Sequence, residues 1–451
     1  MPSSLCQTFQ PILLVLLSLR LSTTLPPHNQ HSTLAFGGPK GSASMRGWFQ
    51  TCARRGMSDG NVHPTMMAVA DEAFNVAPMM KHTHKHWRYF FKLLSRRSVV
   101  YSEMIPATKL VEEPERAYEE YLSHSSEEYP LVVQLGGREE EVLGQAAKIV
   151  RASGKFSSLN FNCGCPSDTV AAQFRGGAQL MMEPHHVAAC CRAMRDEGVD
   201  VSVKCRTGVE HLKDSSLNDG SEVFTYDELA RFIDIVAREG QVKNFVIHAR
   251  KAILGIGTID NRMIPPLDYQ RVCRLAEDFP EIRFVLNGGL TNVESCKELL
   301  STTKLHGVMV GRQIINHPWS WARVDEEIYQ EEPKIKTREM VLQEYIEYVR
   351  KEKKKFLEMD LSEAQMQNNT RIMVAPVYNL FNGEACCSQW RRQLLTMLKH
   401  GVSADTIISS SMEGLPGQVL SLSQYEFVPD HLIPKYDKAK VSVSQLTSQI
   451  V

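Results

Sequence analysis

The most constraining feature of this chain is a series of eight short apolar runs, rich in β-branched residues, between residues 74 and 312. They alternate with longer stretches of helical periodicity, such as Glu139–Ala152 and Tyr226–Glu239, in which apolar residues recur every three or four positions. Eight strand-and-helix repeats over about 240 residues are typical of a (β/α)8 barrel, which usually spans about 250 residues. We therefore predict an α/β fold, a TIM barrel, with strands at Phe74–Ala77, Val99–Glu103, Leu131–Gln134, Ser158–Asn162, Val201–Lys204, Phe245–His248, Arg283–Asn287 and Gly307–Val310.

A doubly wound parallel sheet is the main alternative to the barrel. It is disfavoured because the first apolar run is not followed by the Gly-x-Gly-x-x-Gly turn of a dinucleotide-binding sheet. Two stretches, His211–Val223 and Gly255–Pro266, are predicted as long loops after the fifth and sixth strands. We expect the first of these loops to lie on the rim of an active site, since barrel sites form at the carboxyl ends of the strands.

Beyond about residue 332 the strand pattern gives way to helical periodicity. The helical stretches are Met340–Val349, Ile372–Phe381 and Gln389–Leu398. We predict a barrel over residues 70–330, followed by a smaller C-terminal all-helical domain over residues 335–425. The segment from Gly401 onward is rich in Ser, Gln and Pro, so we expect it to be loosely attached, with a flexible tail over residues 426–451.

The N-terminal segment has the composition of a targeting leader, because residues 1–58 contain no Asp or Glu. The run Pro11–Leu17 suits the apolar core of a signal peptide, and a stretch rich in Ser and Thr, with Lys and Arg, follows it as in an organelle transit peptide. This two-part pattern resembles plastid leaders, so we expect residues 1–60 to be removed or disordered, and the protein to reach a plastid or a mitochondrion. Residues 1–10 carry no positive charge, which keeps a cytoplasmic protein with a disordered N-terminus as the alternative.

Cysteine usage and charge exclude several classes of protein. The 11 cysteines are an odd number and lie inside predicted strands and helices, which favours a reduced compartment over a disulfide scaffold. We expect no metal site, because no Cys-x-x-Cys pair or nearby His set is present. The net charge is −1, and about −5 without residues 1–59, so nucleic-acid binding would need a local patch such as Arg350–Lys355, which could equally be a solvated helix face. We expect a monomer, with no stable membrane association of the mature chain.

Four of the predicted strands end in a polar, cationic or thiol-bearing group. Val132–Gln134, Val201–Lys204 and Phe245–His248 carry it at their last position, and Ser158–Asn162 is closed by a turn containing Gly164-Cys165-Pro166. Because the carboxyl ends of parallel barrel strands meet at one face, we predict a single site containing Gln134, Cys165, Lys204 and His248.

The last two predicted strands end in glycine-containing turns, Asn287-Gly288-Gly289 and Gly311-Arg312. Backbone N–H groups and a cation in such turns can hold a phosphate, and barrels often bind phosphate after strands seven and eight. We therefore predict a flavin phosphate at these loops, although each could by itself be a plain tight turn.

Lys204 and His248 each have a second interpretation. A lone ammonium at the end of a buried strand needs an anionic or polar partner, and a flavin would provide one, since a cation near its N1 and O2 edge stabilises the reduced anionic form. Lys204 could instead form a structural ion pair, and His248 could be a satisfied core histidine.

Cys165 is the candidate catalytic residue. A thiol with the ordinary pKa of about 8.5 stays mostly protonated at pH 7 and can act as an acid. Reduction of a carbon–carbon double bond conjugated to a carbonyl needs a hydride at one carbon and a proton at the other, and a flavin and Cys165 would divide these tasks. We interpret Cys163, Cys190, Cys191 and Cys205 as small buried residues.

A set of motifs over about residues 72–400 resembles the tRNA dihydrouridine synthases in order and spacing. They are Val76–Met79, His82–Arg88, Tyr101–Met104, Val133–Gly137, Asn160–Asp168, Val203–Arg206, Ile247–Lys251 and Val310–Arg312. Arg262–Tyr269, and Asn379–Gly383 with Trp390–Arg392, are similar to the bacterial-type branch that acts on D-loop positions 20 and 20a.

The resemblance implies a barrel that binds FMN, NADPH as the reductant, a helical tRNA-binding domain, and reduction of uridine to 5,6-dihydrouridine. It implies that Cys165 protonates C5 while hydride from flavin N5 reaches C6. The residues that it implies for the cofactor are Ala77, Pro78, Met79, Gln134, Lys204, His248, Asn287, Gly288, Gly289, Gly311 and Arg312. Those that it implies for the substrate are Glu103, Asn162, Arg206 and Arg250, of which the two arginines could contact RNA phosphate or FMN.

The chain departs from the family pattern at three places. The segment Gln173–Met181 is one residue longer, the loop after Lys204 is longer, and Cys163 replaces a usual aliphatic residue beside Cys165. Two other functions stay open: a flavin barrel that acts on a free small molecule, and a tRNA-binding protein without catalysis. Activity on free uridine would indicate the first, and a purified protein without flavin absorbance would indicate the second.

Overall fold

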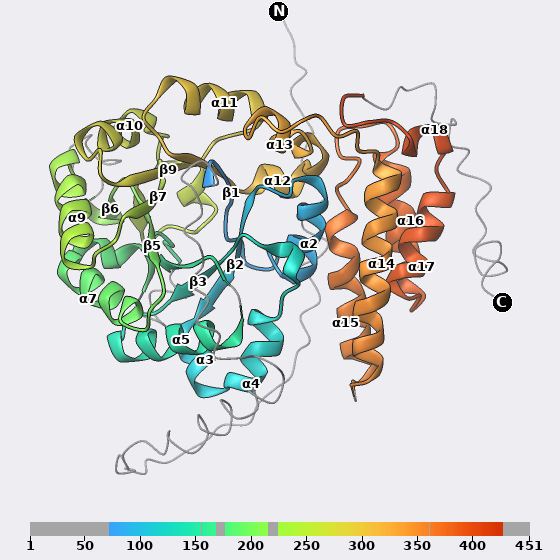
Figure 1. The fold of residues 1–451 in the computed structure, drawn as a ribbon, viewed down its shortest axis with the longest axis horizontal. Helices are drawn as coiled ribbons and strands as arrows, with labels where there is room; N and C mark the ends of the chain where they lie inside the picture. Colours follow the sequence, from blue (N-terminus) through green and yellow to red (C-terminus); the bar gives the residue numbers. More distant parts are fainter. Residues whose placement is uncertain (1–71, 155, 168–175, 215–223, 360, 427–451) are drawn as a thin grey trace, which may run out of the picture. The chain divides into compact units, whose positions relative to one another are not determined.

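The computed structural model describes residues 72–154, 156–167, 176–214, 224–359 and 361–426, which all belong to one compact unit (Figure 1). The predicted leader over residues 1–60 lies outside the described residues, as do residues 427–451 of the predicted tail. Within the described ranges, no helix combines the length and the apolar character that a membrane span requires.

Eight parallel strands close into a barrel, which confirms the predicted TIM-barrel fold (Figure 1). Around the barrel their order is β1, β10, β9, β7, β5, β4, β3 and β2. They are β1 (Phe74–Val76), β2 (Val99–Pro106), β3 (Leu131–Gly136), β4 (Ser158–Asn162), β5 (Val201–Arg206), β7 (Asn244–His248), β9 (Arg283–Asn287) and β10 (Gly307–Val310). Each coincides with a predicted run. Two further short strands, β6 (Val209–His211) and β8 (Ala252–Leu254), pair with each other beyond the ends of β5 and β7 and were not predicted.

Helices connect successive barrel strands and surround the sheet (Figure 1). The predicted helices over Glu139–Ala152 and Tyr226–Glu239 are confirmed as α5 and α9. α9 begins at a capping box in which Thr225 and Glu228 each accept the other's backbone N–H, so its N-terminus is fixed by the sequence. The connecting helices are α2 (Lys85–Leu94), α3 (Ala107–Glu112), α4 (Pro114–Ala117), α5 (Glu140–Ser153), α7 (Pro184–Arg195), α9 (Tyr226–Glu239), α10 (Tyr269–Asp278) and α11 (Val293–Thr302), followed by α12 (Arg312–Asn316) and α13 (Val324–Glu327).

The barrel interior has an apolar floor below a polar layer. A separate buried cluster, which includes Tyr101, Val132, Val246, Val285 and Met309, forms the floor. Because side chains alternate along a strand, the residue two positions further on points to the same side. The polar layer therefore begins where Val132 is followed by Gln134, Val246 by His248 and Val285 by Asn287.

The register of the strands brings the polar side chains of neighbouring strands to one level. It pairs Gln134 with Asn160, Asn162 with Lys204, and His248 with both Arg206 and Asn287. These pairs lie at the carboxyl ends of their strands, the face at which barrel sites form.

The segment after the barrel is helical, as predicted. It contains α14 (Arg338–Leu357), α15 (Glu363–Val374), α16 (Cys387–Lys399), α17 (Ala404–Glu413) and α18 (Gly417–Leu420). α14 and α16 contain the predicted helices at Met340–Val349 and Gln389–Leu398.

Two details of the C-terminal prediction are wrong. The helix predicted over Ile372–Phe381 lies earlier in the chain, because α15 begins at the capping box of Ser362 and Gln365 and gives way to a 3-10 turn over Ala375–Val377, which contains Pro376. The segment after Gly401 is not loosely attached over α17, since that helix packs against α14 and α16 and buries Ile407 and Ile408 completely.

Candidate active site

The turn that carries Cys165 is held by the last residue of β4. The side-chain oxygen of Asn162 accepts hydrogen bonds from the backbone N–H groups of Gly164 and Cys165, both at 3.1 Å. A side chain at Gly164 would place its Cβ 3.3 Å from the carbonyl oxygen of Lys204, so glycine permits this close approach to β5. Arg206 donates from Nε to the Gly164 carbonyl at 2.9 Å, and the turn is thus fixed from both sides.

A chain of side-chain hydrogen bonds leads from Asn162 into the barrel. Asn162 Nδ2 donates to Gln134 Oε1 at 3.1 Å, and Gln134 Nε2 donates to Asn160 Oδ1 at 2.7 Å. Asn160 Nδ2 then donates to Ser202 Oγ at 2.8 Å, whose hydroxyl donates to the carbonyl of Leu159 at 3.1 Å. Backbone groups that cannot exchange roles stand at both ends, N–H donors at the Cys165 turn and a carbonyl acceptor at Leu159. The orientation of all three amides is therefore determined by the backbone.

Lys204 has an amide partner rather than a carboxylate. Its Nζ donates to Asn287 Oδ1 at 3.0 Å, and no described acidic residue forms an ion pair with it. Burial, and to a lesser extent the positive charge of Arg206, together lower the pKa of Lys204 to about 8. An ammonium held without an acid favours binding of an electron-rich or anionic group, and the structural ion pair considered for Lys204 is not formed among the described residues.

His248 lies beside the glycine turn after β9. Burial lowers its pKa well below the ordinary value, and the nearby cations Arg206, Lys204, Arg250 and Arg312 add to this effect. Its imidazole is therefore neutral at physiological pH and can both donate and accept a hydrogen bond.

The two glycine turns after β9 and β10 have different steric requirements. Gly288 and Gly289 have φ values of 119° and 73°, which disfavour other residues. A Cβ at Gly288 would lie 2.8 Å from Cδ2 of His248. A Cβ added at Gly311 would lie 3.6 Å from Ala77 Cβ and 3.7 Å from Met79 Sδ, at ordinary contact distances, so this turn faces the loop after β1 without excluding a side chain.

Three arginines gather at the mouth of the site without carboxylate partners among the described residues. Arg250 donates from Nη1 to the carbonyls of Met263 and Pro265, and Arg312 is exposed. Burial lowers the pKa of both Arg250 and Arg262, and the charge of Arg312 lowers it further in each case. Arg262 is also close enough to Cys165 for a charge on one to affect the ionisation of the other. This cluster is suited to phosphate groups.

Arg206 and Asn162 use their polar atoms within the protein. Arg206 is 3% exposed and donates from Nη1 to the carbonyls of Lys251 and Asn261, at 3.0 and 3.1 Å, in addition to its bond with Gly164. Both residues were predicted to contact substrate, and their hydrogen bonds place them beneath the Cys165 turn.

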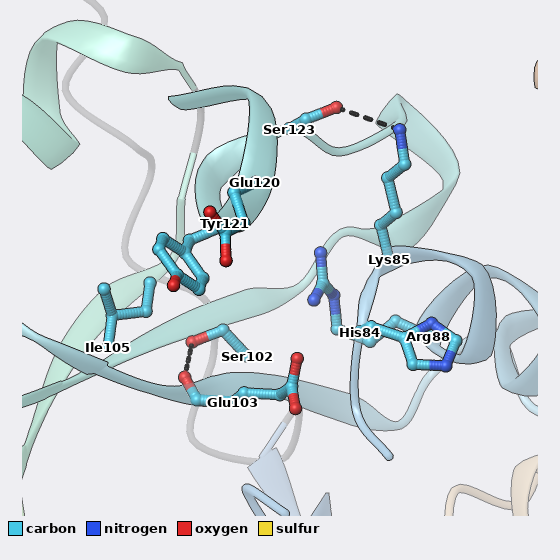
Figure 2. Close-up of a pocket in the computed structure, with 9 residues that line it drawn as sticks. All are labelled: His84, Lys85, Arg88, Ser102, Glu103, Ile105, Glu120, Tyr121 and Ser123. Atoms are coloured by element: carbon cyan, nitrogen blue, oxygen red, sulfur yellow. Dashed lines mark hydrogen bonds between the residues drawn. The ribbon is translucent and has the colours of Figure 1, made fainter. Parts of the chain in front are cut away.

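Glu103 lines a separate small pocket between α2, β2 and the turn Tyr118–Leu122 (Figure 2). Burial raises the pKa of Glu103, while hydrogen bonding from the Lys81 N–H and the charge of Arg88 oppose this shift. The Glu103 carboxylate accepts a hydrogen bond from the backbone N–H of Lys81, in the segment between β1 and α2. The role of Glu103 as a substrate contact stays a prediction.

Cys163 and Cys165 differ in access. Cys163 is completely buried in the core, and burial raises its pKa well above the ordinary value, whereas Cys165 is only partly buried. Cys163 matches the interpretation as a packing residue. Its partly buried neighbour is the thiol that a ligand at the barrel mouth could reach.

Sequence reasoning missed Asn160, Ser202 and Arg262 as site residues. A signal for the first two was present, since Asn160 and Ser202 precede Asn162 and Lys204 by two positions and so face the same interior. Arg262 begins the Arg262–Tyr269 motif noted above, but its position at the site depends on the path of a long loop. The described residues contain no group of three or more His, Cys, Asp or Glu that could hold a metal ion.

Comparison with known proteins agrees with this arrangement. The family model described as dihydrouridine synthase (Dus) matches residues 75–409, which includes all the site residues named above. A Synechocystis protein named tRNA-dihydrouridine(20/20a) synthase is 36% identical over 332 residues, 72% of this chain and 90% of the relative. Proteins of the same name from Vibrio cholerae and Salmonella typhimurium are 34% and 37% identical, covering 77% and 74% of this chain and 98% and 92% of their own length. The chain belongs to the dihydrouridine synthase family.

Proposed function

We propose that this protein reduces uridine to 5,6-dihydrouridine at positions 20 and 20a of the tRNA D-loop, with FMN as cofactor and NADPH as reductant. The family membership and the names of the relatives support the reaction and the positions. The observation that carries the proposal is the partly buried Cys165 thiol, fixed by Asn162 within a group of cations that have no acidic partner among the described residues.

The residues present suit a flavin mononucleotide. Lys204 offers an ammonium without an acid, and the neutral His248 offers a donor and an acceptor. The turn Gly288-Gly289 packs too closely against His248 and Tyr269 to admit a Cβ, so it would offer a flavin phosphate its backbone N–H groups, with the exposed cation Arg312 in the next strand's turn. Gln134, Lys204 and His248 would contact the ring system, while Gly289, Gly311 and Arg312 would hold the phosphate, and Ala77, Pro78 and Met79 would border it. FMN bound there would supply the hydride for C6 of the uracil.

The protein's own contribution to the chemistry is a proton at a defined position. Asn162 and Arg206 hold the turn, so Sγ of Cys165 is presented at the mouth of the barrel, where it would donate its proton to C5. Arg250, Arg262 and Arg312 would attract the RNA backbone, and the helical domain over residues 335–425 would grip the rest of the tRNA.

Localisation belongs to the proposal as well. The acid-free leader over residues 1–60 would direct the protein to a plastid or a mitochondrion, with the cytoplasm as the alternative. A fluorescent protein fused to residues 1–60 would distinguish these compartments.

The central test compares two neighbouring thiols. We expect the purified protein to be yellow, with flavin absorbance near about 450 nm, and to reduce uridine in tRNA but not free uridine. Cys165→Ala should lower the single-turnover rate by about a hundredfold or more, whereas the matched variant Cys163→Ala should retain it. Full-speed reduction by Cys165→Ala would refute the assignment of the acid, and activity on free uridine alone would favour a small-molecule oxidoreductase.

A further inference from the structure

The loop between β8 and α10 exposes four large apolar side chains, of which three lie within six residues of one another and the fourth, Leu267, lies near the end of the loop. Ile259, Met263 and Ile264 are 68%, 64% and 49% exposed, and they surround a single turn of 3-10 helix over Asp260–Arg262. Single exposed apolar residues are common on protein surfaces, but three within six residues form a patch, and such patches mark sites of interaction.

The base of this loop is rigid although its tip is exposed. Asn261 is completely buried, accepts a hydrogen bond from the Ile253 N–H at 2.7 Å and donates to the Ile253 carbonyl at 2.8 Å. Arg250 binds the carbonyls of Met263 and Pro265 on the other side. The backbone that carries the apolar side chains is therefore held in place before any partner binds, which reduces the entropy lost on binding.

The loop adjoins the turn that carries the catalytic thiol. One guanidinium connects them, because Arg206 donates to the Asn261 carbonyl at 3.1 Å and to the Gly164 carbonyl at 2.9 Å. Arg262, between Ile259 and Met263, lies within electrostatic range of both Cys165 and Arg312. The buried Nε atom of Arg262 has no hydrogen-bond partner among the described residues.

We propose that Ile259, Met263 and Ile264 form an apolar wedge that occupies the place in the RNA stack from which the target uridine is extruded. The inference rests on the proposed function and specifies how the substrate is recognised at that site. Arg250, Arg262 and Arg312 would bind the phosphates on either side of the extruded nucleotide.

The physical requirement for such a wedge follows from the reaction. A uracil that reaches Cys165 must leave its stack, which costs a few kcal/mol and exposes the apolar faces of the neighbouring bases. Insertion of Ile, Leu or Met side chains into base steps is a known way to offset that cost. The combination of exposed apolar side chains with cations matches an unstacked polynucleotide, which presents apolar base faces beside phosphates. A second copy of this chain would not require the arginines.

The test uses two substrates and a matched surface control. The triple variant Ile259→Ser, Met263→Ser and Ile264→Ser is compared with the wild type on folded tRNA and on a short unstructured oligonucleotide that contains uridine. We expect kcat/KM and the equilibrium affinity to fall about ten- to a hundredfold with folded tRNA, but less than about twofold with the oligonucleotide, whose bases need no extrusion. Tyr129→Ser is the control, since Tyr129 is 39% exposed and precedes β3, at the barrel face opposite the site.

A conservative variant, Met263→Phe, and a measurement of oligomeric state complete the experiment. Met263→Phe keeps an apolar side chain and should retain wild-type affinity for folded tRNA, while flavin content reports that each variant is folded. The wedge would be overturned by equal losses on both substrates or by no loss on either. It would also be overturned if light scattering showed a change in oligomeric state while the affinity for folded tRNA stayed unchanged. If the wild type reduces uridine in neither RNA, the proposed function fails and the wedge fails with it. If the wild type is active on tRNA and the triple variant is equally active, only the wedge is refuted.

Discussion

The side-chain oxygen of Asn162 lies 3.1 Å from the backbone nitrogen of Cys165, and the same oxygen binds the N–H of Gly164. Its amide nitrogen is occupied by Gln134 Oε1 and Met104 Sδ. An amide oxygen has two lone pairs and an amide nitrogen two protons, so these four contacts use the whole capacity of the side chain. This favours a role for Asn162 in positioning Cys165 over direct contact with a base.

Replacement of Asn162 by alanine should slow proton delivery. The variant leaves two N–H groups of the turn without acceptors, and we expect the single-turnover rate of flavin reoxidation by tRNA to fall about 10- to 100-fold, as loss of about 1–3 kcal/mol implies. Stopped-flow absorbance of the pre-reduced protein measures this rate. Asn162→Asp keeps the acceptor and should lose less, and a wild-type rate in the alanine variant would contradict the positioning role.

Replacement of Lys204 by methionine should stabilise the protein without flavin while abolishing flavin retention. The pKa of Lys204 is lowered from 10.5 to about 8, so the folded state pays for holding the ammonium at pH 7. Removal of that charge should raise the free energy of unfolding by about 1–2 kcal/mol, less than the full shift because some solvent contact remains. Denaturant unfolding of the flavin-free proteins measures the difference.

The pH dependence provides the control for Lys204. Between about pH 8 and 10.5 this lysine binds more protons in the unfolded wild type than in the folded wild type. The free energy of unfolding of the wild type therefore rises with pH over that range. The advantage of Lys204→Met should therefore be complete below about pH 8 and should vanish near pH 10.5. An advantage that is independent of pH would mean that packing, rather than charge, causes it.

Replacement of Gly288 by alanine should weaken flavin binding through the backbone. At a φ of 119° an L-residue is strained, and the added Cβ would lie 2.8 Å from Cδ2 of His248. We expect a loss of about 1–3 kcal/mol in stability and a lower flavin-to-protein ratio after purification, both measurable by absorbance and thermal unfolding. Gly417→Ala is the matched control, because nothing lies within 4 Å of its Cβ position, and equal effects of the two changes would refute the specific role of Gly288.

Periodicity predicted the barrel well because each strand is a continuous apolar run with a polar or glycine-containing end. Ser158–Asn162, Arg283–Asn287 and Gly307–Val310 were predicted with the observed ends, since burial on both faces leaves no ambiguity of pattern. The same pattern placed Lys204 and His248 at one face. The paired strands β6 and β8 were missed because three residues are too few for alternation to be recognised.

The partners of the site residues could not be predicted from the sequence. These partners depend on strand register and loop path rather than on residue type. Examples are the hydrogen bond from Lys204 to Asn287 and those from Arg206 to the carbonyls of Gly164 and Asn261. The helical region shows the same limit. α17 was expected to be loose because its Ser-rich composition resembles a linker, whereas Ala404, Ile407, Ile408 and Met412 recur at helical spacing on one side and are buried by tertiary packing.

The basic run on α14 should contribute to tRNA binding through two of its lysines. Arg350, Lys353 and Lys355 are paired with Glu347, Asp405 and Glu352 respectively, so reversing their charge would disturb the helical domain itself. Lys351 and Lys354 are exposed and form no ion pair with a described residue. The double variant Lys351→Glu and Lys354→Glu therefore tests the surface without breaking the packing.

We expect that double variant to bind tRNA about tenfold more weakly at low salt, with a slope of log affinity against log salt reduced by about 2, because each lysine that contacts a phosphate releases about one counterion. Flavin content should be unchanged. Lys243→Glu with Lys304→Glu is the control of equal charge, since both exposed lysines precede barrel strands, at the face opposite the site. If both double variants lose affinity equally, net charge rather than a defined tRNA contact accounts for binding. Equal affinity of wild type and Lys351→Glu with Lys354→Glu across the salt series would exclude this part of α14 from the tRNA interface.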